Sequence, residues 1–349
     1  MSGLSERAPR VEWRRVVLGG LLALAVGAAV VFLIGRAAGF GDLDRTLRKG
    51  QLGWLAVSAL GQLGVFAGYA GAYRCAVAFE GGPSISRGLS LRVTMASFGL
   101  TQLVAAGGAA AMAVTYWAFR RLGFDRRASA VRMIGLNTYV YLVFGLVGWS
   151  AALLALLAGE APLAMTLPWL VVIPVLVLAA RWFTERRRVA RWTAPGGSWL
   201  RQGLAMGVGA AWWVRRALVT PDGRAMLPWA LLYWGGDLAS LWGGLHAFGG
   251  SPGLAALMLA YATGYVANSV PLPFVATGAM DATTTFALTA VGVPLEVALL
   301  GVVAHRVFAF WLPLAPGLTL AALLPGTGRA LERAAASRRH EATDLAALT

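Results

Sequence analysis

Long runs of apolar residues dominate the chain, and short polar segments separate them. A helix needs about 20 apolar residues to cross the roughly 30 Å hydrocarbon layer of a bilayer. Six runs of about this length are predicted to be full spans: Val16–Ile34, Leu52–Tyr73, Met133–Ala158, Leu163–Ala180, Pro228–Phe248 and Leu295–Leu323. Because helices satisfy their own backbone hydrogen bonds in lipid, the pattern predicts an all-α, polytopic integral membrane bundle.

Two further apolar stretches, Val93–Phe119 and Leu254–Ala290, are interrupted by residues that break helices. These breakers are Gly107 and Gly108 in the first stretch and Pro271, Pro273 and Gly278 in the second. Irregular backbone at membrane depth survives only where protein or a water-filled cavity covers it. We therefore expect each stretch to form a broken, re-entrant hairpin.

Cations are concentrated in alternate loops, and this pattern predicts the orientation of the chain, because cytoplasmic loops carry an excess of lysine and arginine. The segments expected in the cytoplasm are both termini, Arg74–Arg92, Arg120–Arg127 and Arg181–Arg191. The segments expected outside are Gly159–Pro162, Gly249–Gly253 and Val291–Pro294. One external loop, Gly35–Gly50, violates the rule with four cations against two acids.

The two halves of the chain resemble each other. Leu122–Ala128 follows the first broken stretch and Val291–Ala298 follows the second, with a glycine at the second position of each. A repeat with opposite orientation is typical of transporters, whose sites lie where discontinuous helices meet. The resulting division is a cytoplasmic N-terminus at 1–15, membrane halves at 16–182 and 228–324, a connector at 183–227 and a cytoplasmic tail at 325–349. Tryptophan and arginine alternate in the connector, which favours an interfacial helix over a solvated linker.

Composition excludes most soluble classes of protein. Hydrophobic residues make up 58% of the chain and charged residues 13%, against about 45–50% and about 25% in soluble domains. The net charge of +15 lies in short loops between spans, so nucleic-acid binding is not expected. Cys75 is the only cysteine, and the three histidines are too scattered for a metal cluster. No hydrolase, zinc-protease or nucleotide-binding motif is present. We therefore expect no enzymatic activity, no cofactor and no metal.

Ionisable residues inside the apolar spans are the candidates for function. The second half holds Asp237, Asp281 and the pair His305-Arg306, whereas the spans of the first half hold only uncharged polar residues. A charge at the bilayer centre costs about 2.5–3.5 kcal/mol on insertion scales, so each needs a partner or a function. Two interpretations stay open. In the first interpretation, Arg306 forms an ion pair with Asp237 or Asp281 that only stabilises the packing of the helices. In the second, the four residues bind a lipid head group. His305 by itself is interpreted as a polar residue of a helix face rather than as a proton carrier.

A family resemblance narrows these alternatives. Pro271–Asp281, Val291–Pro294, Ala304-His305-Arg306 and Phe310–Gly317 together resemble the flippase-like transmembrane domain of lysylphosphatidylglycerol synthases and its stand-alone relatives. The resemblance implies that Asp281 is the hairpin acid, that Pro271 and Pro273 break the hairpin, and that Arg306 is the family arginine. The acid of this chain is Asp where the family pattern has Glu. In the first half, Val104–Ala111 lacks the proline, acid and arginine of the pattern.

The resemblance implies lipid translocation without lipid aminoacylation, because the synthases carry out their chemistry in a separate soluble domain. The expected partners are the bilayer and a lipid with an anionic or polyprenyl-type head group, in a bacterial inner membrane. A homo-oligomer is an open possibility. The alternative function is a non-transporting anchor or partner subunit for an envelope enzyme. A lipid or glycosyl transferase is disfavoured, because Asp42 and Asp44 form the only acidic pair in a loop.

Overall fold

The computed structural model describes residues 40–103, 109–192, 198–266 and 276–347, together with Phe32 and Arg36. All regular secondary structure in these residues is helical, which confirms the predicted fold class. The first predicted span lies outside the described residues except for Phe32, and four predicted hairpin breakers also lie outside them: Gly107, Gly108, Pro271 and Pro273.

The other five predicted spans are helices. They are α3 (Trp54–Ala78), α6 (Arg126–Ala158), α7 (Leu163–Phe183), α11 (Leu227–Ala247) and α14 (Leu295–Ala322). By length and composition, α3, α6, α7 and α14 can cross a membrane; α11 has 21 residues and is about 32 Å long at 1.5 Å per residue. Helix α6 begins at Arg126 rather than at Met133, because Asp125 caps it by accepting a hydrogen bond from the backbone nitrogen of Ala128 at 2.7 Å.

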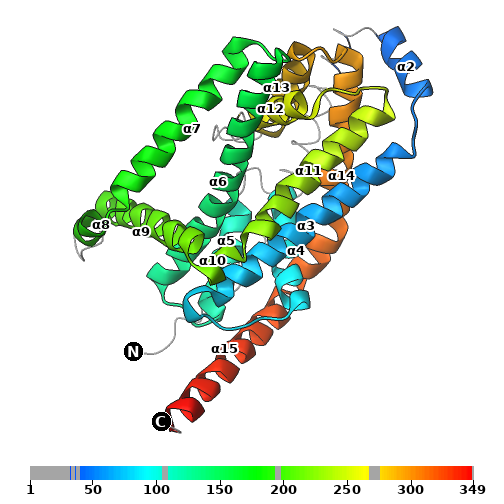
Figure 1. Ribbon diagram of the computed structural model, residues 1–349. Coiled ribbons are helices and arrows are strands. Elements are labelled where there is room, and N and C mark those ends of the chain that lie inside the picture. Colours follow the sequence, from blue (N-terminus) through cyan, green and yellow to red (C-terminus); the bar gives the residue numbers. More distant parts are fainter. Residues whose placement is uncertain are drawn as a thin grey trace.

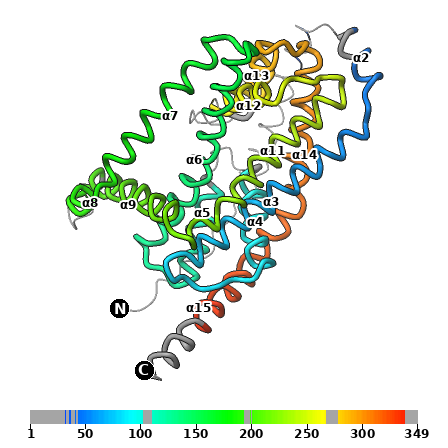
Figure 2. The backbone as a smooth tube through the Cα atoms, in the orientation of Figure 1, coloured from blue at the N-terminus to red at the C-terminus, as the bar shows by residue number. Residues whose placement is uncertain are grey.

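Each of the two interrupted stretches folds as a pair of short helices. The first pair is α4 (Arg87–Leu103) and α5 (Ala109–Arg121), and the second is α12 (Leu254–Val266) and α13 (Ala276–Ala290). These helices have 13 to 17 residues, fewer than the roughly 20 that a full span needs. The two hairpins enter the bundle from opposite ends (Figure 2).

The loops of the bundle gather at two opposite ends (Figure 1). At one end, here called the glycine end, the loops 159–162, 249–253 and 291–294 meet around a cavity of about 390 Å³. At the other, the arginine end, Arg121 of α5 forms an ion pair with Glu332 of α15 (Leu324–Ala347). The cation-rich segment before α3 lies at the glycine end, where the backbone nitrogen of Gln51 donates to the carbonyl of Ala247, so the two ends are not strictly segregated by charge. Which end faces the cytoplasm stays a prediction.

The helices pack with an approximate two-fold symmetry that relates the first half of the chain to the second. Helices α3 and α11 run antiparallel at the centre, while α4 packs on α14 and, correspondingly, α12 packs on α6. The turns after the hairpins also match, since Gly123 and Gly292 have φ values of 87° and 91°. After each glycine, the next backbone nitrogen bonds back five residues, from Phe124 to Phe119 and from Val293 to Leu288. Both turns end a helix with a left-handed glycine.

Small residues allow α3 and α11 to approach closely. A Cβ atom added at Gly61 would lie 2.7 Å from the backbone nitrogen of Ser240, and one at Gly243 would lie 2.8 Å from that of Ser58. Membrane helices lack a hydrophobic drive to associate, so close van der Waals packing across small residues holds them together. This contact fixes Asp237, which lies midway along α11, against α3.

The connector contains α8 (Arg186–Trp192), α9 (Trp199–Val219) and α10 (Pro221–Arg224). Helix α9 lies across the ends of α6 and α7 at the arginine end (Figure 1). Its Trp213 is buried against Phe79, with ring centroids 5.2 Å apart, and Leu200 and Leu204 are exposed. A helix packed on one side and apolar on an exposed side fits the interfacial position predicted for the connector.

Candidate functional site

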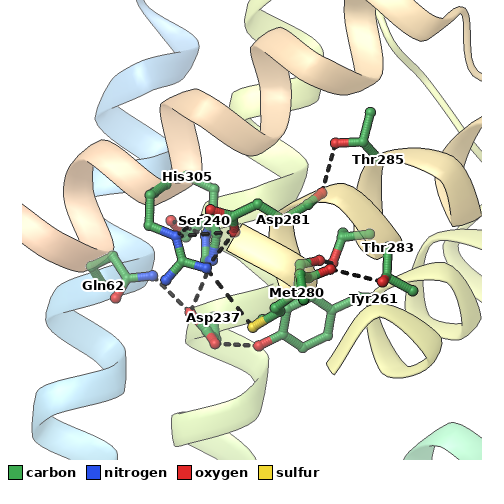
Figure 3. A network of polar contacts seen from close by, with 12 residues as sticks. Gln62, Asp237, Ser240, Tyr261, Met280, Asp281, Thr283, Thr285 and His305 are labelled. Carbon is green, nitrogen blue, oxygen red and sulfur yellow. Dashed lines mark hydrogen bonds and ion pairs between the residues drawn. The ribbon is translucent and has the colours of Figure 1, made fainter. Parts of the chain in front are cut away.

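The structure brings all four predicted charged or polar site residues into one network (Figure 3). Asp237 comes from α11, Asp281 from α13, and His305 with Arg306 from α14. The hairpin residue Gly278 lies one turn before Asp281 and is buried. Because α13 belongs to the second hairpin and α11 and α14 are long helices beside it, the network lies where the broken and the continuous helices meet.

Arg306 and Asp281 form the ion pair of this network. The Nε atom of Arg306 lies 3.0 Å from both carboxylate oxygens of Asp281, and an Nη atom donates to the same group. The side chains keep 25% and 19% of their surface exposed. Of the two expected partners, Asp237 and Asp281, Arg306 pairs with Asp281. Two donors on one carboxylate also match the fork geometry in which a guanidinium binds phosphate.

Asp237 is held by donors from other helices. Gln62 of α3 donates to its Oδ1 atom at 2.7 Å, and Tyr261 of α12 donates to its Oδ2 atom. His305 lies on the other side, with Nε2 3.7 Å from Oδ1. The carboxylate side chain is 13% exposed. Buried charge is stabilised when several hydrogen bonds replace the lost water, and here those bonds come from both halves of the chain.

His305 is deeply buried and is part of the interior network. It is 4% exposed, and its Nδ1 atom lies 3.1 Å from the hydroxyl of Ser240. Ser240 is itself fully buried, and its backbone carbonyl accepts a hydrogen bond from Ser58 of α3 at 2.6 Å. The imidazole therefore connects α14 to the close contact between α3 and α11.

The two halves of the repeat carry different residues at equivalent positions. Gly292 follows Gly123 by 169 residues, and the same shift relates Asn137 to Arg306 and Met112 to Asp281. In the described contacts, Asn137 forms hydrogen bonds with uncharged groups: it donates to the carbonyl of Met133 and accepts from the hydroxyl of Tyr69. The positions equivalent to Arg306 and Asp281 are therefore uncharged in the first half, in agreement with the missing acid and arginine of its sequence pattern.

An aromatic cluster adjoins the network on the side of Tyr261. The rings of Phe144 and Trp234 stack with centroids 4.1 Å apart, and Tyr261 meets Phe144 edge-on at 5.9 Å. Tyr265 extends the cluster, and its hydroxyl lies 3.3 Å from that of Tyr141. Amphipathic aromatic side chains combine an apolar body with a polar tip. The cluster therefore gives the network a wall of mixed polarity between α6, α11 and α12.

Sequence reasoning missed several residues of the network. It treated Gln62 only as an uncharged polar residue of a span, and it did not single out Tyr261 or Ser240. Their signal was present but ambiguous. Gln62 lies on the same face of α3 as Ser58 and Gly61, and Tyr261 and Tyr265 are spaced by one helical turn in a short apolar helix.

A second buried charge, Arg132, was also missed, because the predicted span began one residue after it. Its guanidinium donates to the backbone carbonyls of Ala76 and Phe79 at 3.1 and 2.9 Å, at the end of α3. It also lies 4.3 Å from the ring of Phe124 and 3.6 Å from the carboxylate of Glu80. Arg132 therefore caps α3 and joins it to α6 near the arginine end.

Among the residues that the structure describes, no group of three histidine, cysteine, aspartate or glutamate side chains could hold a metal ion. The interior network instead provides a guanidinium, two carboxylates, an imidazole and a tyrosine hydroxyl. These groups can form hydrogen bonds and ion pairs with a polar or charged head group.

Comparison with known proteins identifies the family. The family described as "Lysylphosphatidylglycerol synthase TM region" matches residues 20–317, which include both hairpins and every residue of the network. No curated protein matches the chain at a significant level. Because the match covers most of the chain, this membrane protein belongs to the family of the lysylphosphatidylglycerol synthase transmembrane region.

Proposed function

We propose that this protein moves a membrane lipid between the two leaflets, and that the lipid head group binds beside Arg306 and Asp281. The observation that carries the proposal is the ion pair between a broken hairpin and a long helix. Arg306 lies eleven residues into α14, where a charge is costly. Many transporters contain two repeats of opposite orientation, with the substrate site formed by broken helices. Movement of one repeat against the other exposes this site to each side of the membrane in turn.

Arg306 supplies the chemistry of head-group recognition. Asp281 holds its guanidinium through two oxygens, and a phosphate group offers the same pair of acceptors. A phospholipid or polyprenyl phosphate would therefore exchange with Asp281, and the pair would re-form after release. The proposed activity involves no chemical change of the lipid. Its proposed location is a bacterial inner membrane, with both termini in the cytoplasm.

The test uses purified protein in liposomes that contain fluorescent phosphatidylglycerol, phosphatidylethanolamine or polyprenyl phosphate. A membrane-impermeant quencher reports the leaflet of each lipid. We expect wild-type protein to move at least one of these lipids, and Arg306→Gln to reduce the rate at least tenfold while the protein remains folded. Asn137→Ala, at the equivalent position of the other half, is the matched control and should retain the rate. A wild-type rate in Arg306→Gln would exclude the proposed site.

The exposure of α7 favours a second candidate function, a membrane anchor for a partner protein. Only 11% of the most apolar 18-residue segment of this helix is buried inside the protein. Its exposed apolar residues include Leu167, Val171, Val175 and Leu178. Large exposed apolar surfaces mark contact with lipid or protein. If purified protein moves no lipid in the liposome assay, and if Val171→Ser with Leu178→Ser abolishes assembly with an envelope enzyme in cells, the anchor is the better description.

A further inference from the structure

The interior network has an unbalanced charge. Arg306 is the only lysine or arginine between Arg224 and Arg329, whereas Asp237 and Asp281 are both carboxylates of the network. Segments 104–108 and 267–275, which are not among the described residues, contain no ionisable side chain. With His305 neutral, the network therefore carries one negative charge in excess. An uncompensated charge in the membrane interior is costly and needs a counter-charge.

Asp237 is the carboxylate without an arginine partner among the described contacts. Asp281 is bound by Arg306 through both oxygens. The hydrogen bonds that Asp237 accepts come from the neutral donors Gln62 and Tyr261, and the imidazole of His305 lies 3.7 Å away. The missing positive charge therefore belongs beside Asp237.

The remaining groups that face Asp237 do not take up a proton near neutral pH. They are tyrosines on α6, α11 and α12, and Arg306 on α14: Tyr141, Tyr233, Tyr261, Tyr265 and Arg306. A tyrosine is already protonated near neutral pH, and an arginine does not lose its proton in a protein. Asp281 faces the network from α13 but is engaged by Arg306. The Asp237 carboxylate and the His305 imidazole are the two groups that can accept the missing proton.

Burial favours a proton over a larger cation. The side chains of Asp237 and His305 are 13% and 6% exposed, and both oxygens of Asp237 already accept hydrogen bonds. A head-group ammonium would need to displace Gln62 or Tyr261, whereas a proton needs no additional space. When Nδ1 of His305 donates to Ser240, the lone pair of Nε2 faces Oδ1 of Asp237, and one proton can bind to either atom.

We propose that Asp237 and His305 share one exchangeable proton, and that its binding and release drive the movement of lipid, a coupling that rests on the proposed function. Water at one end of the bundle would supply the proton, which binds as a carboxylic acid on Asp237 or as an imidazolium on His305. Release to the other end restores the carboxylate and the neutral imidazole. Carboxylates and imidazoles in membrane segments are the usual groups of proton relays.

Infrared difference spectroscopy of the protein in lipid tests the proton site without any transport measurement. A pH step should change the carboxyl or imidazole bands of the wild-type protein. Asp237→Asn and His305→Gln, which keep the approximate size of the side chain but not its titratable group, should each abolish that change. Asp44→Asn, on the exposed helix α2 (Phe40–Arg48), is the matched control and should retain it. An unchanged wild-type spectrum between pH 5 and pH 9 would overturn the proposal.

Liposome transport tests the coupling separately. A pH gradient should change the wild-type rate at least fivefold, and the rate of folded Asp237→Asn should not respond to the gradient. Lipid movement that ignores the gradient in the wild type would overturn the coupling but leave the proposed function intact. The infrared change without any lipid movement would contradict the proposed function but support the proton site. A band change that appears only when a lipid with an ammonium group is added would assign the missing charge to the lipid and overturn the proposal.

Discussion

The side-chain amide of Gln62 donates to the carboxylate of Asp237 at 2.7 Å and joins the two halves of the chain in the interior of the bundle. The two residues are 175 positions apart in the sequence. Their contact depends on the close approach of α3 and α11, because a short polar bond between helices requires small residues beside it. Gly61 and Gly236 provide that space.

Replacement of Gln62 by leucine should destabilise the protein, because Asp237 would lose its donor from α3. Removal of one partner of a buried hydrogen bond costs about 1–3 kcal/mol. Reversible unfolding in mixed detergent micelles measures the free energy of unfolding. Gln51→Leu, at an exposed position before α3, is the control and should change it little. Equal values for the two variants would contradict the structural role of Gln62.

The ion pair between Arg306 and Asp281 should show coupling in a double-mutant cycle. Arg306→Gln and Asp281→Asn should each lower the free energy of unfolding, because each leaves one charge without its partner. The double variant should recover about 0.5–3 kcal/mol of the summed loss, which is the range for residues in direct contact. Additive losses would show that the two side chains do not stabilise each other in the membrane.

The glycine contact between α3 and α11 should not tolerate a methyl group. Gly61→Ala would place a Cβ atom 2.7 Å from the backbone of Ser240, whereas Gly64→Ala on the same helix would meet its nearest neighbour at an ordinary 3.5 Å. We expect Gly61→Ala to cost about 1–3 kcal/mol through overpacking, and Gly64→Ala to be nearly neutral. Thermal unfolding of the two variants in detergent provides the comparison. A melting temperature that is lower for Gly64→Ala than for Gly61→Ala would contradict this packing.

Arg132 should stabilise the junction of α3 and α6. Arg132→Met keeps much of the apolar stem but leaves the carbonyls of Ala76 and Phe79 without their donor, and it leaves the charge of Glu80 less compensated. We expect a loss of about 3 kcal/mol, the lower value for breaking a buried charged contact. Arg187→Met, at an exposed position of α8, should have little effect. Equal melting temperatures for the two variants would contradict the capping role.

Labelling of single cysteines should determine the orientation of the bundle. In a Cys75→Ser background, a membrane-impermeant thiol reagent added outside cells should modify Glu160→Cys at the glycine end. The same reagent should leave Arg127→Cys at the arginine end unmodified until the membrane is opened. The reason is the excess of cations that cytoplasmic loops carry. Modification of Arg127→Cys alone would reverse the predicted orientation.

The sequence by itself determined the fold class and the positions of most helices. Apolar runs of about 20 residues must be helical in a membrane, because the backbone finds no other hydrogen-bonding partners there. Interrupted runs between loops of like charge predicted the two hairpins, and the glycines at 123 and 292 marked equivalent turns, because only glycine readily adopts a positive φ. The cost of a charge in lipid singled out Asp237, Asp281 and Arg306.

Only the tertiary structure decided how these residues are paired. The sequence offered Asp237 and Asp281 equally as partners of Arg306, and the packing of α13 on α14 selected Asp281. It did not connect Gln62 or Tyr261 with Asp237, because a contact between distant helices depends on their rotation and spacing, which side-chain packing sets. Nor did it find Arg132, since an arginine near the end of a span is ordinarily exposed. Its burial follows from the position of the end of α3, which a local pattern does not contain.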